Sequence, residues 1–466
     1  MGVDFLLEVI MKYIPSLDIN FKPAVLEVNN FLNAVTCSGL ANEITICLER
    51  TKNYNYIRKM MVFKDNVGYD DENFRIVERI VKSLLWIVGG YKIYIHGSKE
   101  LTKRLKKAYS ETGLRSFDYN FMSRVYENKV QIIECLNLAE LIEKEEVIKM
   151  ENNLDGCRIG FDAGGSDRKV SAVIDGNVIF SDEVVWFPKI NSNPQYHYEG
   201  ILDSMKTAAS HMPRVDSIGV STAGITVDNK IMVASLFIKV PDELYHEKVK
   251  NIYIDVAKEF GDIPLVVAND GDVTALAGAL ELKTDKVLGI AMGTSEAGGY
   301  IGKDFSLLGW LNELAFVPVD FNEQSMVDEW SGDYGCGVKY FSQDSVIKLA
   351  EYGGFKFRED DSPARKLKII QDLFEEDSAL AQEIFENIGI YLGYTIAYYA
   401  MFYDIKHILL LGRVVSGRGG NTILAKAREV LYAEFPELAN IIMHLPDEKN
   451  RRVGQSIAAA SLPKIH

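Results

Sequence analysis

Residues 158–176 read RIGFDAGGSDRKVSAVIDG, and the organisation of the whole chain can be worked out from this stretch. A short apolar strand breaks at Asp-Ala-Gly-Gly-Ser, residues 162–166, and the chain then becomes strand-like again, which predicts an antiparallel hairpin. Glycine permits the positive φ values of a tight turn and lets a ligand approach the backbone. Backbone N–H groups exposed in such a turn form an anion site that suits phosphate oxygens.

The same pattern of strand, glycine turn and strand or helix recurs downstream. It is found in SIGVSTAG (217–224), IPLVVANDGDVTALAGALEL (263–282), VLGIAMGTSEAGGYIG (287–302) and HILLLGRVVSGRGGNTILAKAREVL (407–431). Two glycine hairpins, at 162–166 and 293–299, each start a block of this kind. The repetition predicts two α/β lobes that are built alike.

The length of 466 residues allows about three domains at roughly 150 residues each. The charged stretch at 142–156 is the best seam. We therefore expect an N-terminal α/β domain over 1–155, a first lobe over 156–282 and a second lobe over 283–466, whose last helix could pack back on the first lobe. Residues 77–111 show the order helix, strand, glycine, helix, and residues 388–434 near the C-terminus show the same order. The N-terminal domain is therefore either a degenerate extra lobe or an unrelated α/β unit.

Charge and cysteine content limit the function classes. The net charge of −15 argues against a sequence-independent grip on nucleic acid or on an anionic membrane, because both require a basic face. The sequence contains no apolar run of about 18 residues, so we expect no membrane span. The N-terminal stretch favours an amphipathic helix over a signal peptide. Five scattered cysteines without a CxxC pair suit the reducing cytoplasm.

The acid–base candidate is Asp270, which stands where a buried strand ends and a helix begins. One interpretation makes Asp270 the N-cap of that helix. The other makes it a general base that takes a proton from a substrate hydroxyl as this hydroxyl attacks phosphorus. Asn269 beside it can fix the neighbouring hydroxyl. Asp162 can hold a hydrated Mg²⁺ that bridges phosphates.

The order of these motifs resembles the ROK family of sugar kinases and regulators, within the actin-like, hexokinase-like ATPase fold, whose lobes are ribonuclease H-like. The resemblance covers about residues 157–463. Residues 162–166 look like the first phosphate motif, Asn269-Asp270 like the segment with the catalytic base, 293–299 like the second phosphate motif and 411–416 like the adenosine motif. It implies a two-lobed α/β fold, ATP, Mg²⁺ and a base at Asp270. The nucleotide and phosphate ligands that it implies are Asp162, Gly164, Gly165, Ser166, Gly293, Thr294, Ser295, Gly298, Gly412 and Ser416.

The chain departs from the family pattern on the substrate side. Phe316 stands where the family has a histidine, and Val338 where it has a second glutamate. Cys336 is a single thiol without a nearby histidine, so we expect no zinc site. Arg413 replaces a usual glycine and could crowd the ribose. The expected substrate ligands are Asn269, Asn312, Glu313, Ser235, Asp328 and Glu329.

Asp328 and Glu329 belong to an acidic cluster together with Asp333, and Trp330 is expected to supply a stacking surface there. The alternative is that this cluster is a solvated loop. We expect an ATP-dependent kinase that phosphorylates a hydroxyl of a sugar-like small molecule, acts in the cytoplasm as a homo-oligomer, a dimer, and binds no nucleic acid. Two alternatives remain open, a non-catalytic sugar sensor or regulator on the same fold and a degenerate structural member.

Overall fold

The computed structural model describes residues 11–145, 147–149, 153–446 and 448–465. The chain divides into two compact units. Unit 1 comprises Met1–Glu146, Ile290–Gly298 and Trp310–Leu445, and unit 2 comprises Val147–Gly289, Gly299–Gly309 and Pro446–His466. The expected boundaries of three separate domains stay a prediction. Residues 1–10 of the expected N-terminal helix lie outside the described residues.

Unit 2 is built on a five-stranded sheet with the order β12-β9-β6-β7-β8. Its strands are β6 (Cys157–Ala163), β7 (Asp167–Ile174), β8 (Asn177–Val185), β9 (Ser217–Thr222) and β12 (Leu265–Asn269). Strand β7 is antiparallel to β6 and β8, whereas β6, β9 and β12 run parallel. The hairpin predicted around residues 162–166 is confirmed, because Ala163 pairs with Arg168 at the end of the β6–β7 ladder.

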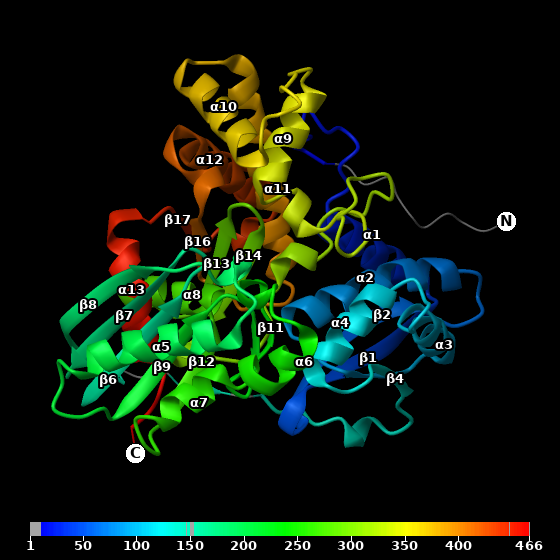
Figure 1. Cartoon of the computed structure of the whole chain (residues 1–466). Coiled ribbons are helices and arrows are strands. Elements are labelled where there is room, and N and C mark those ends of the chain that lie inside the picture. Colours follow the sequence, from blue (N-terminus) through cyan, green and yellow to red (C-terminus); the bar gives the residue numbers. More distant parts are fainter. Residues whose placement is uncertain (1–10, 146, 150–152, 447, 466) are drawn as a thin grey trace. The chain divides into compact units, whose positions relative to one another are not determined.

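Four helices of unit 2 pack against this sheet, namely α5 (Pro194–Ala209), α7 (Ile252–Lys258), α8 (Asp270–Leu282) and α13 (Glu448–Ala460) (Figure 1). The short helix α6 (Asp242–Leu244) is exposed. Short strand pairs join β10 (Ile225–Val227) to β11 (Lys230–Val233) and β5 (Ile148–Lys149) to β15 (Ser306–Leu307).

Helix α13 approaches the sheet closely because glycines leave it room. A Cβ on Gly160 of β6 would lie 1.7 Å from the backbone oxygen of Ser456, and one on Gly219 of β9 would lie 1.7 Å from that of Ala459. The Ser456 hydroxyl also lies 2.7 Å from that of Ser171 on β7. The last helix is therefore an integral part of unit 2.

The N-terminal part of unit 1 has a four-stranded sheet with the order β2-β1-β3-β4. The strands are β1 (Ala41–Glu49), β2 (Asn55–Phe63), β3 (Lys92–His96) and β4 (Gln131–Glu134), and the helices are α1 (Ala24–Cys37), α2 (Asp70–Ile87), α3 (Lys99–Ala108) and α4 (Ser116–Tyr126). Strand β1 is antiparallel to β2 and β3, whereas β3 and β4 run parallel. The interpretations of this domain as a degenerate extra lobe and as an unrelated α/β unit both stay open.

The remainder of unit 1 is dominated by helices α9 (Gln343–Tyr352), α10 (Pro363–Glu375), α11 (Ala379–Tyr399) and α12 (Gly417–Glu434), shown in yellow to orange in Figure 1. Helix α11 is almost wholly buried over its second half and packs along α12. A second sheet has the order β14-β13-β16-β17. Its strands are β13 (Val287–Met292), β14 (Glu296–Ile301), β16 (His407–Leu411) and β17 (Ile442–His444), and the residues of β13 and β14 are divided between the two units.

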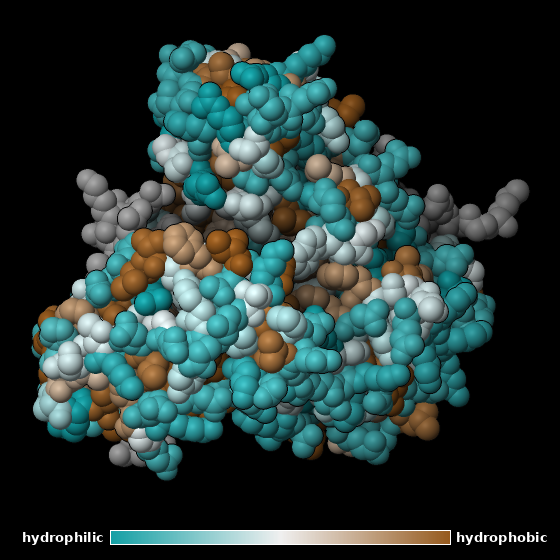
Figure 2. Space-filling model, viewed as in Figure 1, coloured by the Kyte–Doolittle hydropathy of each residue, from teal (hydrophilic) through white to brown (hydrophobic). Residues whose placement is uncertain are grey.

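The surface is mainly hydrophilic on the face shown in Figure 2, with hydrophobic side chains scattered among polar ones. Among the residues that the structure describes, no helix combines the length and the apolar character needed to cross a membrane.

Candidate active site

The first phosphate turn lies in unit 2 between β6 and β7. The Gly164 N–H donates to the Asp167 carbonyl at 3.0 Å and closes the turn. Trp186 fixes the turn from outside, because its Nε1 donates to the Gly164 carbonyl at 2.8 Å and its backbone N–H to the Ser166 carbonyl at 3.1 Å. The N–H groups of Gly165 and Ser166 have no partner in the described part of the chain. They remain available to an anion.

The expected reason for glycine in this turn is wrong in one respect. Neither Gly164 nor Gly165 has a positive φ. Gly164 is required by space, because a Cβ there would lie 2.8 Å from the Asp167 carbonyl oxygen. At Gly165 a Cβ would lie 3.4 Å from Nζ of Lys189. No sequence pattern indicated Lys189, whose ammonium group lies beside the turn.

Asp162 lies near the end of β6 and is only 4% exposed. Its Oδ1 accepts a hydrogen bond of 2.7 Å from the Ser221 hydroxyl, and its Oδ2 lies 3.8 Å from Nζ of Lys169. Burial raises the pKa of Asp162, although both neighbours favour the charged form. Ser221 was missed from sequence, and only the register of β6 with β9, which pairs the two residues, could have indicated it.

Asp270 is the first residue of α8, directly after β12, and is half-buried. The N-cap is Asn269, whose Oδ1 accepts a 2.7 Å hydrogen bond from the Gly271 N–H and whose Nδ2 donates to the Gly224 carbonyl at 2.9 Å. The interpretation of Asp270 as the N-cap is therefore wrong. Burial, and then the negative charge of Asp162, raise the pKa of Asp270 to about 6. Such a carboxyl group ionises close to neutral pH, as a general base requires.

The second phosphate turn, in unit 1, resembles the first. The Gly293 N–H donates to the Ser295 carbonyl at 2.9 Å, while the N–H groups of Thr294 and Ser295 have no partner among the described residues. Both residues are exposed. Gly298 follows in β14, where a Cβ would lie 2.6 Å from the Asn312 carbonyl oxygen. Each of the two turns therefore presents a pair of unpartnered N–H groups.

The predicted adenosine motif follows β16. Gly412 has a φ of 96°, and a Cβ there would lie 2.3 Å from the Met292 carbonyl oxygen, so only glycine fits. The Ser416 hydroxyl donates to the Arg413 carbonyl at 2.7 Å. The Arg413 side chain extends to the second phosphate turn, where Nη2 donates to Oγ1 of Thr294 at 3.0 Å.

The predicted substrate segment is held by the N-terminal helices of unit 1. The N–H groups of Asn312 and Glu313 donate to the carbonyls of Ile87 and Trp86, both at 2.9 Å. Phe316 stacks on Trp86, with ring centroids 4.2 Å apart. The backbone of this segment is therefore fixed by the end of α2.

Other substrate candidates have different settings. The Asn312 side chain is buried, and its Oδ1 accepts a 2.9 Å hydrogen bond from the Tyr403 hydroxyl. Ser235 is exposed and starts the short helix Ser235–Phe237 in unit 2. Glu329 extends into solvent and pairs with Nζ of Lys339 at 2.5 Å. Their roles as substrate ligands stay predictions.

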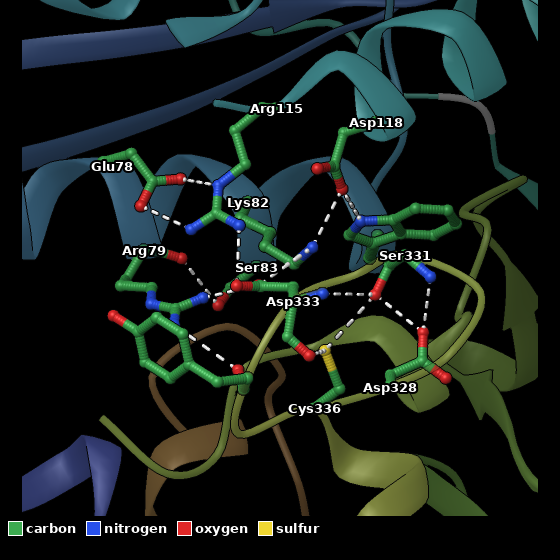
Figure 3. A network of polar contacts seen from close by, with 12 residues as sticks. Glu78, Arg79, Lys82, Ser83, Arg115, Asp118, Asp328, Ser331, Asp333 and Cys336 are labelled. Carbon is green, nitrogen blue, oxygen red and sulfur yellow. Dashed lines mark hydrogen bonds and ion pairs between the residues drawn. The ribbon is translucent and has the colours of Figure 1, made fainter. Parts of the chain in front are cut away.

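Asp333 occupies the centre of a buried ion-pair network (Figure 3). Its carboxylate lies 2.6 Å from Nη1 of Arg79, 3.2 Å from Nζ of Lys82 and 2.8 Å from Nη1 of Arg115. Asp328 is equally buried and accepts hydrogen bonds from the backbone and hydroxyl of Ser331. The interpretation of the acidic cluster as a solvated loop is wrong for these two aspartates, because each is only 5% exposed.

Glu296, the first residue of β14, is a buried acid that sequence analysis did not select. Its Oε1 accepts a 3.3 Å hydrogen bond from the Tyr399 hydroxyl, and its Oε2 has no hydrogen-bond partner in the structure described. Burial raises the pKa of Glu296 to about 8, so that the side chain is protonated at neutral pH. The position of Glu296 within the second phosphate motif did not indicate this burial, because the burial depends on α11 and on Gly337. A Cβ added to Gly337 would lie 2.3 Å from Oε2 of Glu296.

The comparisons with known proteins concern the fold. A crystal structure of ROK hexokinase from Thermus thermophilus matches with a TM-score of 0.52 and 16% sequence identity, over 66% of this chain and 97% of the other. The chain shares the ROK fold. A ROK family transcriptional regulator, a homologue of the E. coli MLC protein, matches with a TM-score of 0.50 and 17% identity, over 67% of this chain and 79% of the regulator.

A ROK family glucokinase from Streptomyces griseus, in complex with glucose and AMPPNP, matches with a TM-score of 0.45 and 20% identity over 66% of this chain and 99% of the other. No protein-family model matches the sequence, and no curated protein is significantly similar to it. The ROK fold therefore accounts for about two thirds of the chain, and it occurs both in sugar kinases and in a transcriptional regulator.

Proposed function

We propose that the chain is an ATP-dependent phosphotransferase that acts on a hydroxyl group of a sugar-like substrate, with Asp270 as the general base. The observation that carries this proposal is the setting of Asp270. Its carboxyl group is free of the capping role, which Asn269 performs, and its pKa is raised to about 6. A carboxylate with this pKa can accept a proton from a substrate hydroxyl at neutral pH.

The two phosphate turns support ATP as the donor. The free N–H groups of Gly165 and Ser166 in unit 2, and those of Thr294 and Ser295 in unit 1, suit phosphate oxygens. Lys189 adds a positive charge beside the first turn. We propose that each turn binds phosphate oxygens, and that Gly412 and Ser416 contact the nucleotide bound at the second turn in unit 1.

The donors present fit a magnesium ion that completes its coordination with phosphate and water. Among the described residues no cluster of three or more His, Cys, Asp or Glu side chains could enclose a metal ion, whereas Mg²⁺ in phosphoryl-transfer sites needs only one or two carboxylates. Asp162 would hold the ion, which when bound neutralises charge on the transferred phosphoryl group. Ser221 orients the Asp162 carboxylate by donating to Oδ1.

The test is a coupled assay of ADP release with Mg-ATP and a panel of sugars, in wild type, Asp270→Asn and the exposed control Asp262→Asn. Asp270→Asn should lower kcat by a factor of about 10² or more, since general-base catalysis contributes about that much. The wild-type rate should rise with pH through about 6, where the base loses its proton. A sugar phosphorylated by Asp270→Asn at the wild-type rate would refute the assignment.

A second candidate, a structural member of the fold that binds no sugar, is favoured by the substrate segment. Phe316 lies against Trp86, and the Asn312 amide is bonded to Tyr403, so both side chains are engaged within the protein. Thermal-shift measurements separate the candidates, because a ligand that binds the native state raises Tm. Stabilisation by Mg-ATP and a sugar supports the kinase, stabilisation by neither supports the structural member, and stabilisation by a sugar alone would instead indicate a sensor.

A further inference from the structure

Arg413 connects the predicted adenosine motif to the second phosphate turn. It follows Gly412, whose φ of 96° and close approach to Met292 fix where the chain leaves β16. From there the exposed side chain reaches Thr294, and Nη2 donates to Oγ1 at 3.0 Å. The guanidinium group therefore lies at the turn whose N–H groups are free.

The backbone of Arg413 is fixed on two sides. Its carbonyl accepts a 2.7 Å hydrogen bond from Nε2 of Gln371 on α10 and another of 2.7 Å from the Ser416 hydroxyl at the start of α12. Gln371 also donates to Ser416 at 3.2 Å. These hydrogen bonds restrict the backbone from which the Arg413 side chain extends, so that the guanidinium group is pre-positioned for a ligand at the turn.

The charge of Arg413 is not neutralised within the described structure. Its side chain forms no ion pair with a carboxylate there, and a hydroxyl accepts only one of its five N–H donors. Arg418, five positions later, differs in this respect, because its Nη1 pairs with Asp377 at 2.9 Å and donates to the Phe374 carbonyl. An arginine with free donors beside unpartnered backbone N–H groups is suited to a phosphate.

We propose that Arg413 binds the phosphates of the nucleotide at the second turn, together with the N–H groups of Thr294 and Ser295. This inference rests on the proposed nucleotide-binding function and assigns one specific contact within it. It replaces the expectation that Arg413 crowds the ribose. If Arg413 contacts phosphate, truncating its side chain should weaken the binding of ATP and leave the binding of adenosine unchanged. If Arg413 crowds the ribose, the same truncation should strengthen the binding of both compounds.

The experiment is calorimetric titration of wild type, Arg413→Ala and the control Arg418→Ala with Mg-ATP and with adenosine. Arg413→Ala should weaken ATP binding roughly tenfold, since hydrogen bonds to charged groups contribute at least that much, and should leave adenosine binding unchanged. Arg418→Ala should bind both ligands as wild type does. The affinity of Arg413→Ala for ATP should also depend less steeply on salt concentration.

Several results would overturn the inference. If wild type binds ATP and Arg413→Ala binds it equally well, the phosphate contact is absent while the nucleotide site stands. If Arg413→Ala binds ATP and adenosine more tightly by the same factor, the side chain crowds the site. If wild type binds no nucleotide, both the contact and the proposed function fail. Because Arg413 is exposed, Arg413→Ala should unfold at the wild-type temperature.

Discussion

Replacing Asp333 tests whether the N-terminal helices hold the loop at residues 328–336. The Asp333→Asn substitution keeps the shape of the side chain and removes its charge. In the buried network of Figure 3, the three cations Arg79, Lys82 and Arg115 then keep only two of their three ion-pair partners, Glu78 and Asp118. One positive charge stays buried without a partner, which is the costly way to disrupt such a network.

The size of the effect follows from burial. Lys82 is fully buried, and Arg79 and Arg115 have side chains exposed by 2% and 5%. Removing one partner of a buried pair costs about 3–5 kcal/mol. For a unit of roughly 300 residues this lowers Tm by about 5–8 °C. Glu329→Gln in the same loop is the matched control, because its side chain is 73% exposed and the loss of its pair with Lys339 costs at most about 1 kcal/mol.

The assay is thermal unfolding monitored by tryptophan fluorescence, since Trp86 donates to Asp118 within the network and reports on it directly. Burial would raise the pKa of Asp333, but the three cations hold it well below its usual range. The carboxylate therefore stabilises unit 1 above its unfolded pKa of about 4 and loses this effect as the pH falls. The Tm difference between wild type and Asp333→Asn should shrink below pH 4. Equal Tm values for Asp333→Asn and Glu329→Gln at pH 7 would refute the reasoning.

Two further substitutions test buried groups of unit 1. Glu296→Gln should have the same Tm as wild type near pH 4.5 and an increasingly higher Tm up to about pH 8, because the folded acid keeps its proton while the unfolded one ionises. The difference in the free energy of unfolding should grow by about 1.4 kcal/mol per pH unit at most. A constant Tm difference across this range would contradict the raised pKa. Phe316→Ala should destabilise the protein by about 2 kcal/mol through loss of the stack on Trp86, compared with less than about 0.5 kcal/mol for Trp330→Ala, whose side chain is 65% exposed. Similar values for the two variants, measured by thermal unfolding, would show that the stack contributes little.

Local patterns in the sequence predicted the elements that depend on neighbouring residues. The hairpin at 162–166 follows from an apolar strand, two glycines and a second strand, and these form a turn whatever surrounds them. The boundary between β12 and α8 was placed correctly at residues 269–270 for the same reason. Of the two interpretations of Asp270, the N-cap is wrong, because Asn and Asp are almost equally suited to capping and only the hydrogen bond from Gly271 distinguishes them.

Contacts between distant segments could not be predicted. Arg79 precedes its partner Asp333 by 254 positions, so the acidic loop was read without the cations that neutralise it. Arg413 was interpreted from the missing glycine alone, since nothing in the sequence shows that its side chain reaches Thr294. In both cases the charge was visible in the sequence, but its partner was set by the fold.

These long-range contacts connect the N-terminal segment to the substrate side of the proposed site. The end of α2 binds the backbone of Asn312 and Glu313, its Trp86 covers Phe316, and its Lys82 and Arg79 hold Asp333. Phe316, one of the positions where the sequence departs from the ROK pattern, therefore faces this helix in unit 1. A phenylalanine in place of a histidine fits a surface that packs on tryptophan, and a buried aspartate fits a loop held by cations. The N-terminal helices and the segments around Phe316 and Asp333 therefore form one packed structure within unit 1, joined by a ring stack and by buried ion pairs.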